Sequence, residues 1–217
     1  MEPVGKNCVI ISGGVFSTIG TITQEDYVIV CDKGYDYARI AGVEPNLIIG
    51  DFDSCSETTR QQLESIDVSA KVERYPSEKD DTDTMLAIKR ALELGCQRIR
   101  IYCGLGGRLD HFYANLQALV YAAKRGVLCT VEDDDNCIYA MGKGSLTLPK
   151  RDGWSISLFA ATDVCQGITT RGLKYALEYG ELVNSFPLGM SNEWAEEMAT
   201  IELSEGILLV ILSKKEG

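Results

Sequence analysis

The stretch Leu47-Ile48-Ile49-Gly50-Asp51-Phe52-Asp53-Ser54 decides how the fold of this sequence is interpreted. The apolar residues Leu47 to Ile49 predict a short buried strand, and Gly50 lets the backbone turn sharply after it. Because side chains two residues apart in an extended chain point to the same side, Asp51 and Asp53 should project together. Paired carboxylates repel each other unless a cation lies between them, and hard oxygen ligands favour Mg2+. The pair therefore indicates a metal-assisted phosphate site, although Asp and Ser are also common turn and helix-cap residues.

The overall composition is that of a globular protein with one or two domains. The chain has 217 residues, of which 45% are hydrophobic, and this allows a substantial core. Its net charge of −11 argues against nucleic acid as a partner, since nucleic-acid-binding surfaces are basic, and suits cationic substrates or metals. No apolar run approaches the ~20 residues of a membrane span, and the first residues lack the pattern of a signal peptide. We therefore expect a cytoplasmic protein that binds neither nucleic acid nor membranes.

The cysteines of the chain indicate a reducing environment. All eight are scattered without a Cys-x-x-Cys pair, and several, such as Cys8, Cys31, Cys103 and Cys129, lie inside apolar runs. Such residues behave as small buried hydrophobes rather than as disulfide partners or zinc ligands.

Strand and helix patterns alternate over the first part of the chain. The expected strands are Asn7–Ile11, Tyr27–Cys31, Leu47–Ile49, Lys71–Tyr75, Arg98–Cys103 and Val127–Val131. Amphipathic helical patterns fall between these strands and end at glycines, which are frequent helix C-caps. This alternation is typical of a parallel sheet covered by helices on both faces. We predict an α/β N-terminal domain, residues 1–132, with a parallel, Rossmann-like sheet.

The alternation of strands and helices stops after residue 136, where short strand patterns follow one another with turns between them. The expected strands are Cys137–Met141, Leu146–Leu148, Trp154–Phe159, Gln166–Thr169, Met198–Leu203 and Ile207–Leu212. Turn residues recur at short intervals, and no helical period interrupts them. Residues 137–217 are therefore predicted to form an all-β sandwich domain.

Charged and glycine residues follow the predicted strands of the N-terminal domain. In open parallel sheets, ligands bind beyond the carboxyl ends of the strands. The residues found there are Asp32, then Asp51 and Asp53, then Lys79, Asp80, Asp81 and Asp83, and finally Gly106, Gly107, Arg108 and Asp110. Each aspartate alone could cap a helix, and Asp81 or Thr82 is expected to do so, but successive loops rich in Asp point to a cation site. Gly106 and Gly107 let backbone amides approach a phosphate, and Arg108 offers a planar fork to its oxygens.

The motifs also carry a specific resemblance to a known family. The motifs Gly50-Asp51-Phe52-Asp53-Ser54, Asp80-Asp81-Thr82-Asp83, Gly106-Gly107-Arg108-Leu109-Asp110-His111, Gly172-Leu173-Lys174-Tyr175, Ser191-Asn192-Glu193 and Gly206-Ile207-Leu208-Leu209 occur in that order. Together they resemble the motif series of the thiamine pyrophosphokinases over nearly the whole chain. The resemblance implies an enzyme that uses Mg2+ to transfer the diphosphate of ATP to the hydroxyl of thiamine, leaving AMP. It also implies a homodimer with an active site near the interface.

The resemblance further implies a role for each matched residue. Asp51, Asp53 and Asp83 would hold Mg2+ on the ATP phosphates and, with Asp110, form the catalytic set, in which Asp83 or Asp110 would accept the hydroxyl proton. The residues that would contact ATP or its phosphates are Asp32, Lys79, Asp80, Gly106, Gly107 and Arg108. The residues that would form the thiamine pocket are Ser191, Asn192 and Trp194, the last of them stacking from the partner subunit.

Other interpretations of the same residues stay open. Trp194 is equally compatible with ordinary packing, and His111, the single histidine, with a place at a helix start. A metal-dependent phosphatase or a sugar-nucleotide transferase would also use Asp-x-Asp. The phosphatase would need an Asp where Ser12-Gly13-Gly14 follows the first strand, and the transferase would not explain Ser191-Asn192. A nucleotide-binding protein without activity is disfavoured, because clustered charge without a use costs stability.

Overall fold

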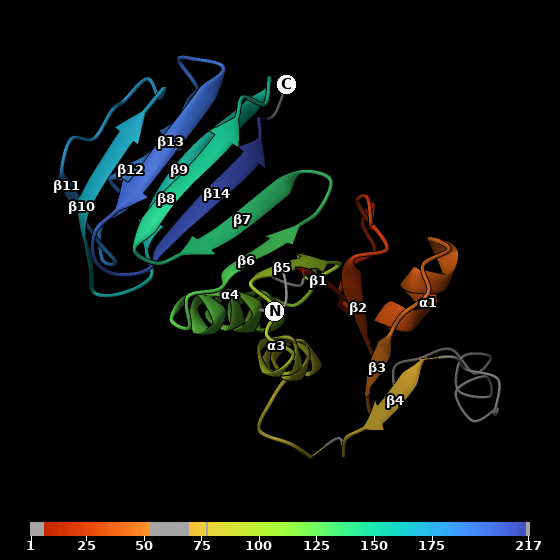
Figure 1. Ribbon diagram of the computed structural model, residues 1–217. Coiled ribbons are helices and arrows are strands. Elements are labelled where there is room, and N and C mark those ends of the chain that lie inside the picture. Colours follow the sequence, from red (N-terminus) through yellow and green to blue (C-terminus); the bar gives the residue numbers. More distant parts are fainter. Residues whose placement is uncertain (1–6, 53–69, 77, 216–217) are drawn as a thin grey trace, which may run out of the picture. The chain divides into compact units, whose positions relative to one another are not determined.

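The computed structural model describes residues 7–52, 70–76 and 78–215 (Figure 1). Its backbone separates into two compact units. The first comprises Met1–Ala118 with Val131–Asp134, and the second comprises Leu119–Thr130 with Asp135–Gly217.

The first unit is built on parallel strands. They are β1 (Asn7–Ile11), β2 (Asp26–Cys31), β3 (Leu47–Gly50), β4 (Lys71–Arg74) and β5 (Arg98–Tyr102). Every pairing among them is parallel, and their order is β5-β1-β2-β3-β4. The apolar, largely β-branched composition of β1 to β3 suits strands that are buried on both sides. The strands lie within a residue or two of the positions expected from the sequence.

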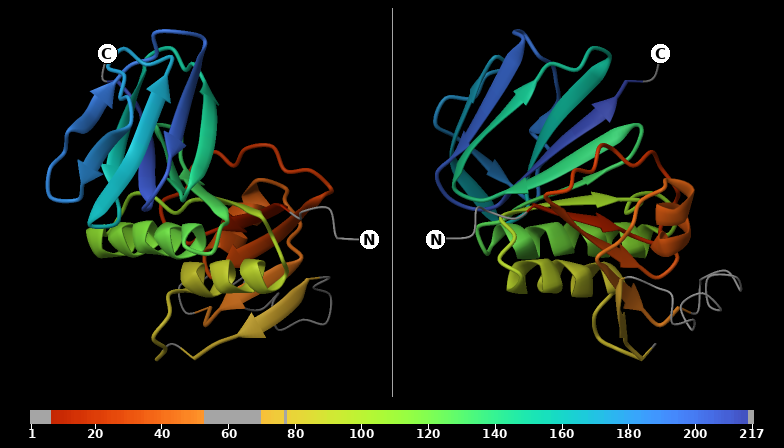
Figure 2. Two further views of the ribbon diagram at one scale, coloured as in Figure 1. Left: turned by 60° about the vertical axis from the view of Figure 1, so that its left-hand side comes forward. Right: turned by 45° about the vertical axis from the view of Figure 1, so that its right-hand side comes forward.

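Helices cover both faces of these parallel strands. Val9 and Ile11 of β1 share a buried cluster with Tyr37 of α1 (Gly34–Ile40). Ile10 points to the opposite face, because alternate residues of a strand do so, and it is also fully buried. On that side lies α3 (Asp83–Glu93), which contacts β1, β2 and β3 (Figure 2).

The sequence predicted correctly how α3 begins. Thr82 is its N-cap, and the threonine hydroxyl accepts a hydrogen bond of 3.2 Å from the backbone N–H of Met85. Asp83 stands in the first helical turn, where its charge is favoured by the helix dipole. The helix expected to start at Ser56 lies outside the described residues.

Two further elements contain residues of both units. They are α4 (Leu109–Ala123) and β6 (Leu128–Glu132). The described helices include none that is long and apolar enough to cross a membrane. The seven cysteines within the described ranges are all buried, in keeping with the apolar runs in which several of them lie, and Cys55 lies outside the described residues.

The second unit consists mainly of antiparallel strands. They are β7 (Asn136–Met141), β8 (Gly144–Pro149), β9 (Trp154–Ala160), β10 (Val164–Arg171), β11 (Gly180–Val183), β12 (Gly189–Asn192), β13 (Met198–Leu203) and β14 (Leu208–Lys214). One set has the order β12-β9-β14-β7, and the other has the order β11-β10-β13-β8. The chain thus combines parallel and antiparallel pairing with few helices.

Both sets of antiparallel strands contribute to one hydrophobic core. Ile156 of β9 and Val210 of β14 are fully buried in the same cluster as Ile168 of β10 and Ile201 of β13. The burial of β8 alternates toward its end, which is the pattern of a strand with one face on a core and one in water. Burial of this shared cluster supplies the main stabilisation of the unit.

Candidate active site

A cavity of about 300 Å³ lies at the carboxyl ends of β1, β2, β3 and β5 in the first unit. Its lining is formed by Ser12, Gly13, Gly14, Cys31, Asp32, Asp51, Lys79, Asp81, Thr82, Asp83, Thr84, Gly104, Gly106, His111 and Asn115. This is the end of a parallel sheet at which ligands bind in open α/β folds. Five of the residues that the sequence singled out as site candidates lie in this lining, namely Asp32, Asp51, Lys79, Asp83 and Gly106.

A close backbone packing brings Asp32 and Asp51 to the cavity. Asp32 directly follows β2 and has a φ of 48°, a left-handed conformation that is unusual for a residue with a side chain. Its N–H donates to the carbonyl of Ile49 at 2.8 Å. A Cβ at Gly50 would lie only 3.2 Å from the backbone of Asp32, so a side chain there would push the two strand ends apart. Glycine at position 50 therefore allows the two acidic residues to sit on adjacent strand ends.

Lys79 provides a positive charge among the carboxylates. Its Nζ lies 2.8 Å from Oδ1 of Asp83, and the two side chains are 15% and 25% exposed. Burial by itself would lower the pKa of Lys79, but the hydrogen bond and the charge of Asp83, with the charges of Asp51 and Asp32, raise it above its ordinary value. Three carboxylates therefore stabilise the charged form of Lys79, which stays protonated at neutral pH.

Other polar residues of the cavity hold its walls together. Asp81 accepts two hydrogen bonds from Lys89 of α3, at 2.8 and 2.7 Å. The hydroxyls of Ser12 and Thr84 are 2.9 Å apart, which ties the loop after β1 to the first turn of α3. Asn115 of α4 donates to the carbonyl of Gly104 at 2.7 Å. These contacts fix the distance between the strand ends and the helices that carry the charged residues.

Sequence reasoning gave no site role to several lining residues. Ser12 directly follows the predicted strand Asn7–Ile11, and its position at a strand end could have marked it as a site candidate. Thr84 and Asn115 belong to no motif, and their partners are far away in the sequence. His111, whose role the sequence leaves open, also lines the cavity.

Some predicted phosphate-binding residues lie outside the cavity lining. Arg108 forms a two-pronged ion pair with Asp110, with Nε 3.1 Å from Oδ1 and a terminal nitrogen 2.6 Å from Oδ2. Both side chains are exposed, and the bond from Arg108 lowers the pKa of Asp110. Asp80 is exposed, and Gly107 with a φ of 72° adjoins the lining residue Gly106. Asp53 lies outside the described residues.

The predicted thiamine-binding residues belong to the second unit. The N–H of Ser191 donates to the hydroxyl of Ser157 at 3.0 Å. The side chain of Asn192 holds the backbone of Tyr175, because it accepts from the N–H at 3.0 Å and donates to the carbonyl at 2.7 Å. A cavity of about 190 Å³ borders Asn192 and Tyr175.

The indole of Trp194 is integrated into the second unit. Its ring packs against the core of that unit, and its N–H donates to the carbonyl of Leu148 at 3.4 Å. The partly buried position of Trp194 is that of a packing residue within its own chain. These contacts within the chain do not test whether Trp194 also stacks on a ligand, as the sequence predicts.

The donor atoms of the cavity are suited to a hard cation. The carboxylates of Asp51 and Asp83 offer oxygen ligands, which Mg2+ prefers. Among the residues that the structure describes, no three His, Cys, Asp or Glu side chains are grouped closely enough to hold a metal ion. The predicted ligand set includes Asp53, which is not described.

The fold and the cavity define an α/β protein with an acidic ligand site at the end of a parallel sheet. The family model "Thiamin pyrophosphokinase, catalytic domain" matches residues 20–131, and "Thiamin pyrophosphokinase, vitamin B1 binding domain" matches residues 145–208. The chain belongs to the thiamine pyrophosphokinase family.

Individual relatives match nearly the whole chain. The thiamine pyrophosphokinase of Bacillus subtilis (strain 168) is 32% identical over 213 residues, which are 96% of this chain and 99% of that protein. A crystal structure of thiamine pyrophosphokinase from Bacillus subtilis superimposes with a TM-score of 0.86 at 29% identity, covering 98% of this chain and 100% of that one. A thiamin pyrophosphokinase family protein from Enterococcus faecalis gives a TM-score of 0.81 at 31% identity, with 98% and 100% coverage.

Proposed function

We propose that this protein is a thiamine pyrophosphokinase, which transfers the diphosphate group of ATP to the hydroxyl of thiamine and releases AMP. The observation that carries the proposal is the acidic cavity, in which Lys79 pairs with Asp83 and is also influenced by the charges of Asp51 and Asp32. This cavity lies in the part of the chain matched by the catalytic-domain model. Transfer of a phosphoryl-type group depends mainly on positioning and on neutralisation of charge, and such a cavity can supply both.

The metal would be Mg2+, held by Asp51, Asp53 and Asp83. When bound, such an ion neutralises phosphate charge and fixes the orientation of the transferred group. Lys79, which bridges to Asp83, is placed to contact phosphate oxygens once a nucleotide enters, and Asp32 and Asp80 complete the acidic ring. The backbone at Gly106 and Gly107 supplies amides close to the cavity.

Arg108 and Asp110 would act together at the edge of this site. The pair is exposed, so Arg108 can exchange its carboxylate partner for a phosphate with little structural change. Asp110 is kept ionised by Arg108, which a proton acceptor requires, and Asp83 is the alternative acceptor. The thiamine hydroxyl would lose its proton to one of these two carboxylates as it attacks the β-phosphorus.

Residues of the second unit would bind the vitamin. Ser191 and Asn192 lie in the part matched by the vitamin B1 binding model, and Trp194 is proposed to stack on the thiamine of a partner subunit. The corresponding architecture is an α/β domain with a Rossmann-like sheet over residues 1–132, followed by a β-sandwich domain over residues 137–217. The parallel order in the first unit and the shared core of the second support it. The active form would be a cytoplasmic homodimer with its active site near the interface.

Product identification tests this proposal. The purified chain is incubated with thiamine, ATP and Mg2+, and the phosphorylated products are separated. Thiamine diphosphate and AMP in equal amounts are expected. Thiamine monophosphate with ADP would show that a single phosphoryl group is transferred, and the absence of any thiamine product despite nucleotide binding would favour a binding protein without activity.

A further inference from the structure

Two large apolar side chains stand half exposed beside the acidic cavity. Val15 is 54% exposed and Phe16 is 47% exposed. They directly follow Gly13 and Gly14, which line the cavity. Cγ2 of Val15 lies 3.1 Å from the position that a Cβ would take at the lining residue Gly106. Val15 therefore borders the cavity at the place where two glycine-containing loops meet, and Phe16 is the next residue of the same loop.

Hydrogen bonds hold the loop firmly before this pair. The N–H of Ser12 donates to the carbonyl of Tyr102 at 2.9 Å, and the N–H of Gly14 donates to the carbonyl of Cys103 at 2.9 Å. The hydroxyl of Tyr37 donates to the carbonyl of Gly14 at 2.8 Å. A Cβ at Gly14 would come 2.5 Å from the same Cys103 oxygen, so the backbones are in direct contact.

The loop is also anchored after the pair, where Ser17 is buried. Its hydroxyl lies 3.7 Å from the sulfur of Cys103. Val15 and Phe16 are thus exposed although hydrogen bonds hold the loop on both sides of them. A fixed backbone presents two apolar side chains to solvent, one of them against the lining residue Gly106 of a polar cavity, and this arrangement fits a ligand surface.

The aromatic ring of Phe16 is oriented by its neighbour. Its centroid lies 5.2 Å from that of Tyr37, with 59° between the ring planes. Tyr37 is itself buried in the core of the first unit, so it fixes one side of the Phe16 ring and leaves the rest accessible. A preoriented ring with an accessible surface is suited to stacking on another flat ring.

We propose that Val15 and Phe16 form the platform for the purine ring of the nucleotide. This inference rests on the proposed function, because it takes the acidic cavity as the site of the cation-bound phosphates. A nucleotide so placed has an uncharged, flat base at one end, and the apolar pair, which follows the lining residues Gly13 and Gly14, is an exposed surface that matches it. The matched catalytic region begins at residue 20, so the family comparison assigns no role to the pair. The vitamin B1 model matches residues 145–208, which puts the recognition of the thiamine rings elsewhere in the chain.

Two triphosphate ligands, one with a nucleoside and one without it, separate this platform from the phosphate site. The first is α,β-methylene-ATP, whose bridging carbon replaces the oxygen of the bond that would break, and the second is inorganic tripolyphosphate. Calorimetric titration with Mg2+ present gives the affinity of each ligand for the wild type, for Phe16→Ala and for Ile40→Ala. Ile40 is the matched control, since it is 71% exposed in the same unit and does not line the cavity.

Phe16→Ala is expected to weaken the binding of α,β-methylene-ATP about tenfold, the loss expected for one base–aromatic stack, and to leave tripolyphosphate binding unchanged. Ile40→Ala should change neither affinity. Phe16→Trp should keep the nucleotide affinity, and its added indole fluorescence should change with α,β-methylene-ATP but not with tripolyphosphate. Thermal melting of each variant confirms that the fold is intact.

Three results would overturn the inference. If Phe16→Ala binds the nucleotide as tightly as the wild type, or loses both ligands equally, the pair is not a base platform. If Phe16→Ala instead lowers the oligomeric mass measured by light scattering, the pair is an interface between copies of the chain. A wild type that binds neither ligand would refute the proposed function itself, whereas a wild type that binds both, with an unaffected Phe16→Ala, refutes the platform alone.

Discussion

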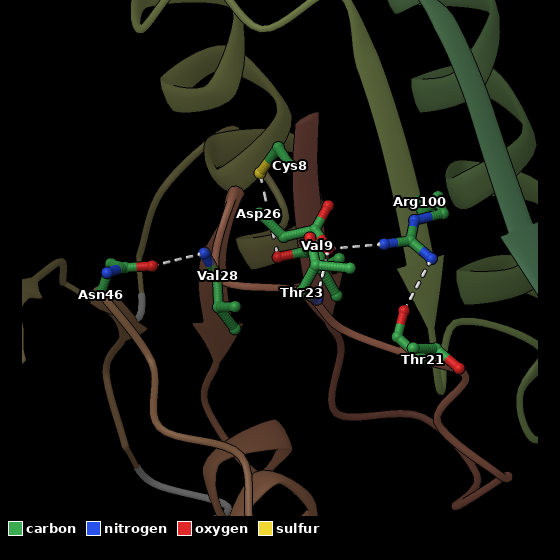
Figure 3. Close-up of polar contacts among 8 residues, drawn as sticks. All are labelled: Cys8, Val9, Thr21, Thr23, Asp26, Val28, Asn46 and Arg100. Carbon is green, nitrogen blue, oxygen red and sulfur yellow. Dashed lines mark hydrogen bonds and ion pairs between the residues drawn. The ribbon is translucent and has the colours of Figure 1, made fainter. Parts of the chain in front are cut away.

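Replacing Asp26 by asparagine is expected to destabilise the first unit by about 2 kcal/mol, because a hydrogen bond to a charged partner contributes roughly that much. Asp26 begins β2, and its side chain is only 1% exposed. Its Oδ2 accepts hydrogen bonds from the N–H of Thr23 at 2.7 Å, from the hydroxyl of Thr23 at 3.0 Å and from Arg100 of β5 at 3.0 Å (Figure 3). Arg100 also donates to the carbonyl of Thr21 at 3.0 Å, so the network connects the loop before β2 to β5.

The asparagine variant removes the charge but keeps the shape of the side chain. The substitution weakens the hydrogen bond to Arg100. Because the side chain of Arg100 is 27% exposed, water can solvate its charge when this bond is weakened. The loss should therefore stay near that of one charged hydrogen bond and below the ~3 to 5 kcal/mol of breaking a fully buried ion pair. The matched control is Asp152→Asn, since Asp152 is 90% exposed and pairs with Lys150 at 3.2 Å. That substitution should change stability by less than about 0.5 kcal/mol.

The effect of the Asp26 substitution should depend on pH in one direction. Burial would raise the pKa of Asp26, but its bonds to Thr23 and the charge of Arg100 outweigh burial and lower the pKa below the ordinary value of 3.8. A carboxyl with a lowered pKa stabilises the folded state above its unfolded pKa, and this stabilisation is lost as the pH falls through its folded pKa. The difference between wild type and Asp26→Asn should thus be constant at neutral pH and shrink below pH 3.8.

Urea denaturation followed by far-ultraviolet circular dichroism measures this difference. The helical signal is the useful one, because both tryptophans, Trp154 and Trp194, lie in the second unit. Equal midpoints for wild type and Asp26→Asn at neutral pH would refute the reasoning. So would a difference that persists unchanged when Asp26 is protonated, because the loss would then come from shape and not from charge.

Three further substitutions test other parts of the account. Asp83→Asn should reduce AMP formation about 100-fold or more, because it removes a proposed ligand of the Mg2+ that would neutralise the phosphates, while the circular dichroism spectrum stays that of the wild type; undiminished turnover would remove Asp83 from the catalytic set. Thr82→Ala should cost about 1 kcal/mol in urea denaturation, because it removes the N-cap hydroxyl of α3, and an unchanged midpoint would contradict that role. Trp194→Ala should raise the Michaelis constant for thiamine more than that for ATP, and an equal change in both would mean that the indole only packs within its own chain.

The parallel strands of the first unit were predictable from local sequence. The residues of β1, β2 and β3 form short apolar runs, and each run is followed within a few residues by glycine, aspartate or both. A fully buried strand needs such a run, and the turn after it needs residues that tolerate unusual backbone angles. The same local signals indicated the Thr82 cap and the concentration of aspartates at the strand ends.

Short strands without an apolar pattern were missed. β11 and β12 contain glycine and polar residues, and neither alternates regularly between buried and exposed positions. β11 pairs with β10, the strand before it, and β12 pairs with the more distant β9, and the register of both pairings is irregular. Propensity alone has little influence on such segments, since the neighbouring strand decides their conformation.

The internal contacts of the candidate site could be predicted only in part. The sequence indicated which carboxylates collect at one edge, because each follows a strand. The pairing of Ser12 with Thr84 joins residues 72 positions apart, and nothing local signals it. The ion pair between Arg108 and Asp110 was also not foreseen, since residues two apart face the same direction only in extended chain and these two stand at a helix start.

The most direct test of the central claim is whether nucleotide binding depends on a divalent cation and on Asp51. Titration calorimetry with α,β-methylene-ATP is performed on the wild type and on Asp51→Asn, each with Mg2+ and with a chelator. The account predicts tight binding only for the wild type with Mg2+, because four acidic residues line the cavity and repel phosphates without a cation. Equal affinity with and without Mg2+, or an Asp51→Asn variant with the same metal dependence as the wild type, would contradict it.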